Sequence, residues 1–179
     1  MARLRKTVVM VGMMGAGKTA VGTALAKHLG VPFRDSDDEI TRAANRSIAE
    51  IFERDGEAFF RARESEVLGR LLRAEPSILS TGGGAFLAPA NRALIHEAGV
   101  SVWLRADLDL LWNRVRHKST RPLLRTDNPR ETLRSLYEAR LPAYEQADLA
   151  VDSAAELSVE DMARRVAEAL KTRADVLEG

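Results

Sequence analysis

The sequence predicts a three-layer α/β fold, in which helices flank a five-stranded parallel sheet. Short apolar runs alternate along the 179 residues with segments of helical periodicity, a pattern typical of βαβ units. A glycine-rich loop also joins the first apolar run to the first helical segment, as in α/β proteins that bind phosphate. Because the length suits one domain and no low-complexity linker divides it, we expect residues 1–179 to form a single domain.

Each apolar run has the length of a strand, and residues that favour turns or caps separate it from the next helix. The predicted strands cover residues 7–11, 32–35, 77–81, 100–104 and 149–151. The predicted helices cover residues 20–29, 47–72, 89–98 and 129–146, with two more after Asp107 and Ser158. Gly30 and Gly99 end two of these helices, and Gly56 interrupts the longest one. Asp107 and Ser158 are predicted N-caps.

The composition excludes several classes of function. Apolar residues make up 45% of the chain and the formal net charge is +1, so bulk charge does not indicate a nucleic-acid or membrane partner. The absence of cysteine excludes disulfides and thiolate metal sites. No apolar stretch approaches the roughly 18–20 residues of a membrane span, and no signal-peptide core follows the basic start. We therefore expect a cytoplasmic, monomeric protein that binds small molecules.

Residues 12–19 match the phosphate-loop pattern G-x-x-x-x-G-K-[ST], placed between a strand and a helix as that motif requires. Its glycines let backbone N–H groups surround phosphate oxygens, and the helix adds its positive N-terminal end. Lys18 should reach the β- and γ-phosphates, and the Thr19 hydroxyl should bind Mg²⁺. The predicted ATP-binding residues of this loop are Gly12, Gly15, Ala16, Gly17, Lys18, Thr19 and Ala20. The loop alone does not distinguish kinases from GTPases or ATPases.

Two carboxylates follow the second predicted strand. Asp35 and Asp37 are two residues apart, so they share a face if the backbone there is extended. The carboxyl ends of parallel strands are where open α/β sheets bind ligands. One carboxylate could then hold Mg²⁺ through water, and the other could accept a proton from an attacking hydroxyl. The alternative is that they only cap the following helix.

Three further features suggest an anionic ligand. Arg61 could pair with Glu57 one helical turn away, or could grip a ligand carboxylate with its planar guanidinium. Residues 82–84 are three glycines, more than a turn needs, which favours close approach of the backbone to a ligand. Between residues 114 and 130 there are six basic residues and one acidic residue, which suggests a lid over a triphosphate at about residues 115–129.

Together these features resemble the shikimate kinase family. The matching segments, in the order of the family, are residues 12–19, Asp35-x-Asp37, Phe59-Phe60-Arg61-x-x-Glu64, Gly82-Gly83-Gly84, Arg121-Pro122-Leu123-Leu124 and Arg140-x-x-x-Tyr144. The resemblance covers about residues 7–170. It implies the phosphate-loop kinase fold of nucleoside-monophosphate-kinase type, with strand order 2-3-1-4-5. It also implies transfer of the ATP γ-phosphate to the 3-hydroxyl of shikimate, in aromatic amino-acid biosynthesis.

The resemblance also implies roles for individual residues. Asp37 would bind the shikimate hydroxyls and act as base, within a substrate-binding region at about residues 35–64, and Asp35 would belong to the Mg²⁺ shell. Lys18 and Arg121 would assist catalysis. Arg121 would lie in the lid and bind ATP, and Arg114 would bind ATP near adenine. The remaining shikimate-binding residues would be Arg61 and Arg140 on the carboxylate, Glu64 orienting Arg61, Gly82, Gly83 and Gly84 through their N–H groups, and Phe52 and Phe60 as the apolar wall.

Two other functions remain open at this point. A sister kinase such as a gluconate kinase would share the phosphate loop and the fold, but should lack the triple glycine and the Arg61/Arg140 pair. A non-catalytic nucleotide-binding relative should have lost Asp37, Arg61, Arg121 or Arg140, and all four are present.

Overall fold

The computed structural model describes residues 3–82, 84–116 and 126–178. Its central sheet contains five parallel strands, β2 (Thr7–Val11), β3 (Phe33–Asp35), β4 (Ile78–Ser80), β5 (Gly99–Arg105) and β6 (Leu149–Asp152). They lie in the order β3-β4-β2-β5-β6, and every neighbouring pair is parallel. Numbered among themselves along the chain, these strands have the order 2-3-1-4-5. The predicted fold class and strand order are therefore confirmed.

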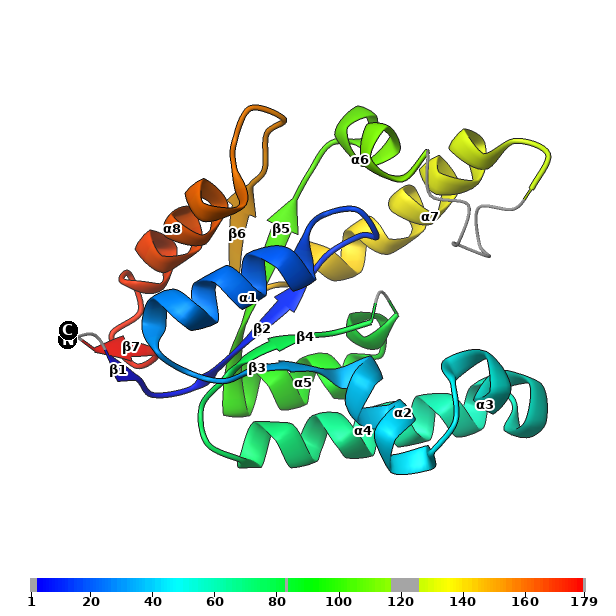
Figure 1. Cartoon of the computed structure of the whole chain (residues 1–179), viewed down its shortest axis with the longest axis horizontal. Helices are drawn as coiled ribbons and strands as arrows, with labels where there is room; N and C mark the ends of the chain where they lie inside the picture. The colour runs from blue at the N-terminus through cyan, green and yellow to red at the C-terminus, as the bar shows by residue number, and fades with distance from the viewer. Residues whose placement is uncertain (1–2, 83, 117–125, 179) are drawn as a thin grey trace.

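Helices cover both faces of the sheet (Figure 1). On one face α1 packs against α8, and on the other α5 packs against β5 and α4. The remaining helices connect these layers or extend beyond the strand ends. Their bounds are α1 (Lys18–Leu29), α2 (Ser36–Ala44), α3 (Ile48–Asp55), α4 (Glu57–Arg73), the 3₁₀ turn η1 (Ala85–Leu87), α5 (Pro89–Ala98), α6 (Leu108–Val115), α7 (Pro129–Tyr144) and α8 (Val159–Leu170).

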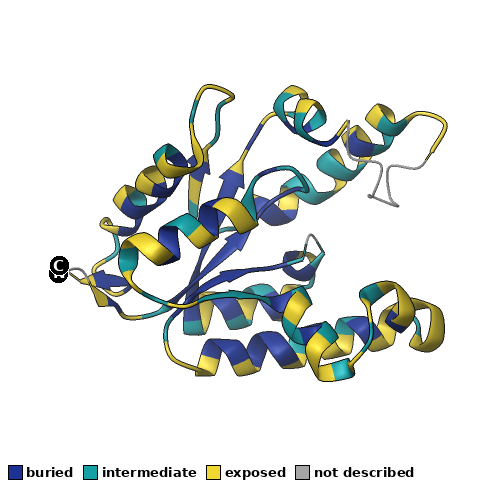
Figure 2. Ribbon diagram, viewed as in Figure 1, coloured by how far each residue is buried: buried dark blue, intermediate teal, exposed yellow. Residues whose placement is uncertain are grey.

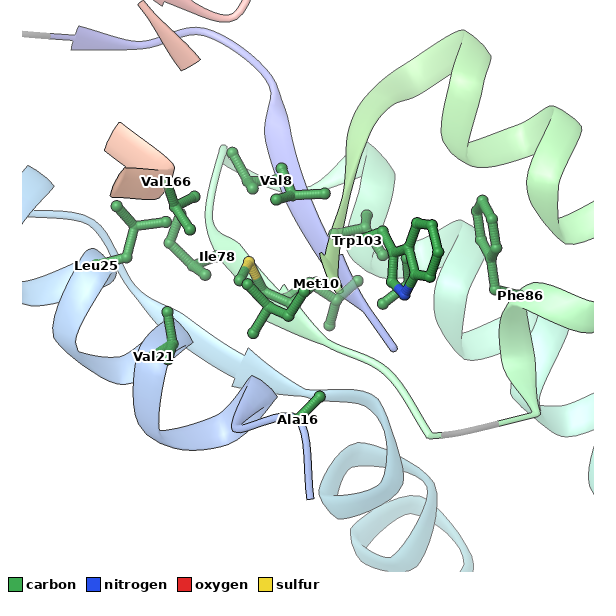
Figure 3. Packing of buried hydrophobic residues seen from close by; sticks show 14 of the residues in the cluster. Val8, Met10, Ala16, Val21, Leu25, Ile78, Phe86, Trp103 and Val166 are labelled. Carbon is green, nitrogen blue, oxygen red and sulfur yellow. The ribbon is translucent and has the colours of Figure 1, made fainter. Parts of the chain in front are cut away.

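The core lies between the sheet and its helices. Strand β2 is buried along its whole length, as the dark strands in Figure 2 show. Figure 3 shows side chains from the two sides of this core, among them Leu25 of α1, Val166 of α8 and Trp103 of β5. Continuous apolar runs are what a strand covered on both faces requires. The loop of residues 12–19 leaves the carboxyl end of this buried strand.

The helix boundaries follow from capping residues that the sequence displays. Asp107 and Ser158 accept hydrogen bonds from backbone N–H groups at the starts of α6 and α8, as predicted. Gly56 has φ 88° and separates α3 from α4, so the predicted break is confirmed. Pro129 begins α7 at the first helical position.

A second, very small sheet joins the two ends of the described chain. Strand β1 (Arg3–Leu4) pairs antiparallel with β7 (Leu177–Glu178), at the left of Figure 1. Strands of two residues carry no detectable periodicity, so the sequence did not predict them. No helix in the described parts of the chain combines the length and apolarity that crossing a membrane requires.

Candidate active site

A cleft of about 790 Å³ lies beside the ends of β3 and β4 and the loop that follows β2. It brings together segments that lie far apart in the sequence. The predicted site residues that line it are Gly15, Ala16, Gly17, Lys18, Thr19, Ala20, Asp35, Asp37, Phe52, Phe60, Arg61, Glu64, Gly82, Gly84, Arg114 and Arg140. Gly12 is buried at the start of the phosphate loop, and the predicted site residues Gly83 and Arg121 lie outside the described residues. The lid prediction, about residues 115–129, also falls mostly outside them.

The phosphate loop has the backbone conformation that its glycines predict. Gly12, Gly15 and Gly17 have φ angles of 151°, 84° and 93°, which side-chain-bearing residues rarely adopt. Gly17 is the N-cap of α1, so the first N–H groups of that helix face the loop. Lys18 Nζ donates to the Gly12 carbonyl at 2.5 Å and lies 3.4 Å from the Met13 carbonyl. The loop and helix therefore form an anion site with the lysine folded across it.

Arg114 of α6 fixes the outer side of this loop. Its guanidinium donates to the Gly15 carbonyl at 3.0 Å and to the Ser153 hydroxyl at 3.2 Å. A Cβ on Gly15 would lie 2.7 Å from a methyl group of Val115, so the loop packs directly on α6. Arg114 thus joins the phosphate loop to the segment after β6, a contact that sequence spacing did not indicate.

Asp35 and Asp37 reach the cleft by a different route from the predicted one. They do not share a face of an extended strand, because Asp35 ends β3 and Asp37 lies in the first turn of α2. Asp35 is the N-cap of α2 and accepts from the N–H of Asp37 at 2.9 Å and of Asp38 at 3.3 Å. The capping interpretation is therefore correct for Asp35, yet both carboxylates line the cleft.

Asp37 is the electrostatically unusual member of the pair. Its Oδ1 is buried and has no hydrogen-bond partner among the described residues. Burial, with the negative charges of Asp35 and Glu64, raises the pKa of Asp37 to about 6, although Lys18 opposes the rise. Burial also raises the pKa of Asp35. A carboxylate oxygen that has no hydrogen-bond partner among the described residues, in a cleft, is placed to accept a proton from a bound hydroxyl.

Arg61, on α4, lines the same cleft and also forms ion pairs within its own helix. It is 3.7 Å from Glu57, as an ion pair on the helix surface would be, and its guanidinium also lines the cleft. Its Nη1 donates at 2.9 Å to Glu64, whose side chain is only 2% exposed. Burial raises the pKa of Glu64, and the hydrogen bond from Arg61 opposes that rise. Because the buried Glu64 carboxylate accepts this charged hydrogen bond, it orients the Arg61 guanidinium.

Gly82 and Gly84, after β4, leave room for charged side chains of the cleft and have no φ angle that only glycine favours. A Cβ on Gly82 would lie 2.9 Å from Asp37 Oδ1, and one on Gly84 would lie 2.6 Å from Arg61 Nη2. Gly84 has φ −95°, which any residue can adopt. The sequence predicted close approach of this backbone to a ligand. The structure adds that the same backbone closely approaches the two charged side chains of the cleft.

The family model that matches this sequence is that of shikimate kinase, and it covers residues 14–171. The chain belongs to the shikimate kinase family. The shikimate kinase of Cereibacter sphaeroides is 74% identical over 99% of this chain and 89% of its own length. That of Ruegeria pomeroyi is 72% identical over 99% of this chain and 91% of its own length.

Solved shikimate kinases have the same fold. The enzyme from Acinetobacter baumannii, in complex with shikimate, has a TM-score of 0.85 and 38% identity, covering 93% of both chains. The enzyme from Bacteroides thetaiotaomicron has a TM-score of 0.86 and 32% identity, covering 93% of this chain and 98% of its own. A gluconokinase from Sinorhizobium meliloti, at 18% identity and TM-score 0.60, shares the fold alone.

The described residues of this shikimate kinase family member contain no group of three or more His, Cys, Asp or Glu side chains that could hold a metal ion. Mg²⁺ in kinases is typically bound by one or two protein oxygens together with phosphates and water. Thr19 and Asp35 line the same cleft and offer a hydroxyl and a carboxylate, which are oxygen ligands of the required kind.

Sequence reasoning missed part of the cleft. Its lining also includes Ser153, Leu157, Val159 and Met162, at the end beside Arg114. These residues follow β6 and begin α8, far along the chain from the phosphate loop, and no local pattern marks them. Tyr144 was noted only as part of a motif, whereas its hydroxyl donates to the Gly12 carbonyl over 3.2 Å.

Proposed function

We propose that this chain transfers the γ-phosphate of ATP to the 3-hydroxyl of shikimate, giving shikimate 3-phosphate for aromatic amino-acid biosynthesis. The observation that carries the proposal is the composition of one cleft. The lining includes a phosphate loop, Asp37, whose Oδ1 has no hydrogen-bond partner among the described residues, and the guanidinium-bearing residues Arg61 and Arg140. An acceptor with both a hydroxyl and a carboxylate matches these groups.

The nucleotide part of the proposal assigns the phosphates to the loop of residues 12–19. Its N–H groups and Lys18 would bind the β- and γ-phosphates. Thr19 and Asp35 would hold Mg²⁺, which would supply positive charge against the phosphates. Arg114 would border adenine and, through the Gly15 carbonyl, keep the loop in shape. Arg121, from the lid at about residues 115–129, would neutralise charge on the transferred group.

The acceptor part assigns shikimate to the region of residues 35–64 and to residues that face it. Arg61 and Arg140 would bind the carboxylate, with Glu64 orienting Arg61. The backbone of residues 82–84 would donate N–H groups. The apolar wall would be Phe52 and Phe60, whose ring centres are 4.8 Å apart.

In this proposal Asp37 hydrogen-bonds the 3-hydroxyl and takes its proton as the oxygen attacks the γ-phosphorus. With a pKa of about 6, Asp37 is mostly ionised at neutral pH and still basic enough to accept that proton. Closure of the lid would exclude water, which limits hydrolysis of ATP. We also propose that the protein is a single domain, that it is a monomer and that it is cytoplasmic. Sedimentation would test the oligomeric state, and cell fractionation would test the location.

A coupled assay of ADP release tests the proposal. Purified protein with Mg²⁺ and ATP is given shikimate, gluconate, AMP or no acceptor. ADP release that depends on shikimate supports the proposal. ADP release that depends on gluconate instead would indicate that the protein is a gluconate kinase. No release with any acceptor, despite ATP binding, would favour a non-catalytic relative. Omitting Mg²⁺ should abolish the shikimate-dependent release.

A further inference from the structure

The 3₁₀ turn η1 follows the glycines of the cleft, and its carbonyl groups accept hydrogen bonds from side chains of α5. Asn91 Nδ2 donates to the Ala85 carbonyl at 2.9 Å. Arg92 Nη1 donates to the carbonyls of Phe86 and Leu87 at 2.8 and 2.9 Å. All the residues of this turn are thus bound through their backbone to the first turn of α5, which fixes the position of η1.

Asn91 also joins η1 to α4, the helix that carries Arg61 and Glu64 and lies beside α5 (Figure 1). The Ser65 hydroxyl donates to Asn91 Oδ1 at 2.8 Å, and Asn91 is only 2% exposed. A backbone carbonyl can only accept, so the amide nitrogen faces Ala85 and the amide oxygen is left for Ser65. The buried amide of Asn91 therefore connects the two elements with both of its polar atoms.

The backbone that Asn91 holds continues directly into the glycines of the cleft. The N–H of Leu87 donates to the Gly84 carbonyl at 3.2 Å. A Cβ on Gly84 would lie 2.6 Å from Arg61 Nη2, so this backbone packs directly against the guanidinium. Arg61 lies one helical turn before Ser65 on α4. The hydrogen bonds through Asn91 therefore set the distance between the glycine backbone and the guanidinium.

We propose that Asn91 is a positioning residue for the acceptor: by joining η1 to α4, it sets the distance between the backbone of Gly84 and the guanidinium of Arg61. Both of these groups are assigned to shikimate in the proposed function, so the inference deepens that function and rests on it for the identity of the acceptor. Asn91 is not itself part of the cleft lining, and it acts through the two groups that are.

Ser65→Ala is the first test, because it removes one hydroxyl from a half-buried position and leaves Asn91 on the Ala85 carbonyl. Shikimate and ATP are titrated separately into the full chain by calorimetry. We expect shikimate to bind roughly 3- to 10-fold more weakly, since the buried amide oxygen loses its donor and η1 is no longer joined to α4. ATP should bind as before, because the phosphate loop takes no part in these contacts. Ser65→Thr keeps the hydroxyl and should retain the original shikimate affinity.

Asn91→Ala removes both hydrogen bonds and should weaken the binding of shikimate by roughly 10- to 100-fold. In the ADP-release assay the KM for shikimate should rise by a similar factor, whereas kcat should change little, as for a loss of acceptor binding alone. Ser101→Ala is the matched control, since it removes a hydrogen bond to the largely buried Asp148 carboxylate and lies outside the cleft lining. It should lower Tm and leave the affinities for shikimate and ATP unchanged.

Unchanged shikimate affinity in either Ser65→Ala or Asn91→Ala would overturn the inference. Equal weakening of shikimate and ATP would do so too, as would a loss of shikimate affinity in Ser101→Ala as large as in Ser65→Ala, because either result would indicate a general effect of lower stability. If Asn91→Ala does not fold, as judged by circular dichroism, the comparison of Ser65→Ala with Ser65→Thr decides.

Failure of the inference can be distinguished from failure of the proposed function. An unmodified chain that neither binds shikimate nor releases ADP with it would refute the proposed function and this inference together. Shikimate-dependent ADP release by the unmodified chain, with the same shikimate affinity in the variants, would refute the inference alone.

Discussion

Replacing Asp37 with Asn should stabilise the protein at neutral pH and at the same time remove its proposed base. Asp37 is partly buried, its buried Oδ1 has no partner among the described residues, and Asp35 and Glu64 add negative charge around it. Its pKa is therefore raised from 3.8 to about 6. Since one pKa unit is worth about 1.4 kcal/mol, ionised Asp37 should cost the folded state about 3 kcal/mol at pH 7.

The sign of the pH dependence follows from proton binding. Between the unfolded pKa of 3.8 and the folded pKa of about 6, the folded protein holds more of the Asp37 proton than the unfolded chain does. The contribution of Asp37 to stability therefore falls as the pH rises through this window. Asn does not titrate, so the stability advantage of Asp37→Asn over the original chain should grow from pH 4 to pH 7.

Urea unfolding at several pH values between 4 and 7.5 measures this advantage. We expect it to increase by about 2–3 kcal/mol across the range, with the largest slope between pH 4 and 6. An advantage of Asp37→Asn that is independent of pH, or that shrinks as the pH rises, would refute the reasoning.

The remaining predictions concern turnover and acceptor affinity. Arg140→Ala should weaken the binding of shikimate by roughly 10- to 100-fold and the binding of ATP much less, because it removes a charged hydrogen-bond donor. Calorimetric titration, with Arg134→Ala as the control, would check this. Glu64→Gln should raise the KM for shikimate roughly 5- to 30-fold with little change for ATP, since Arg61 loses its buried anionic partner; an unchanged KM would contradict the assigned role. Gly82→Ala should lower kcat by at least roughly tenfold while Tm stays close to the original, because the added Cβ would displace only the Asp37 carboxylate; a large loss of Tm would show that the backbone had moved instead.

The fold could be predicted from the sequence because its signals are local. Five apolar runs, glycines at helix ends and the caps Asp107 and Ser158 each specify a boundary, and all five predicted parallel strands are present. Periodicity does not determine which strands are neighbours, and the strand order came from the family resemblance. The antiparallel pair β1 and β7 was missed because two-residue strands depend on contacts between the chain ends.

Which residues line the cleft could be predicted better than how they are arranged there. A run of polar residues after a strand does not reveal where the next helix begins, and α2 begins at Ser36, so Asp35 caps it and Asp37 is helical. Likewise, three consecutive glycines indicate a close approach without identifying what approaches. The Tyr144–Gly12 hydrogen bond joins residues 132 positions apart and leaves no spacing signal.

The most direct test of the central claim is identification of the product by ³¹P and ¹H NMR after reaction with Mg²⁺, ATP and shikimate. We predict ADP and a single new phosphomonoester whose phosphorus couples to the proton on carbon 3 of shikimate. Inorganic phosphate as the only new phosphorus signal, or phosphate on another hydroxyl, would contradict the account of Asp37 and the acceptor pocket.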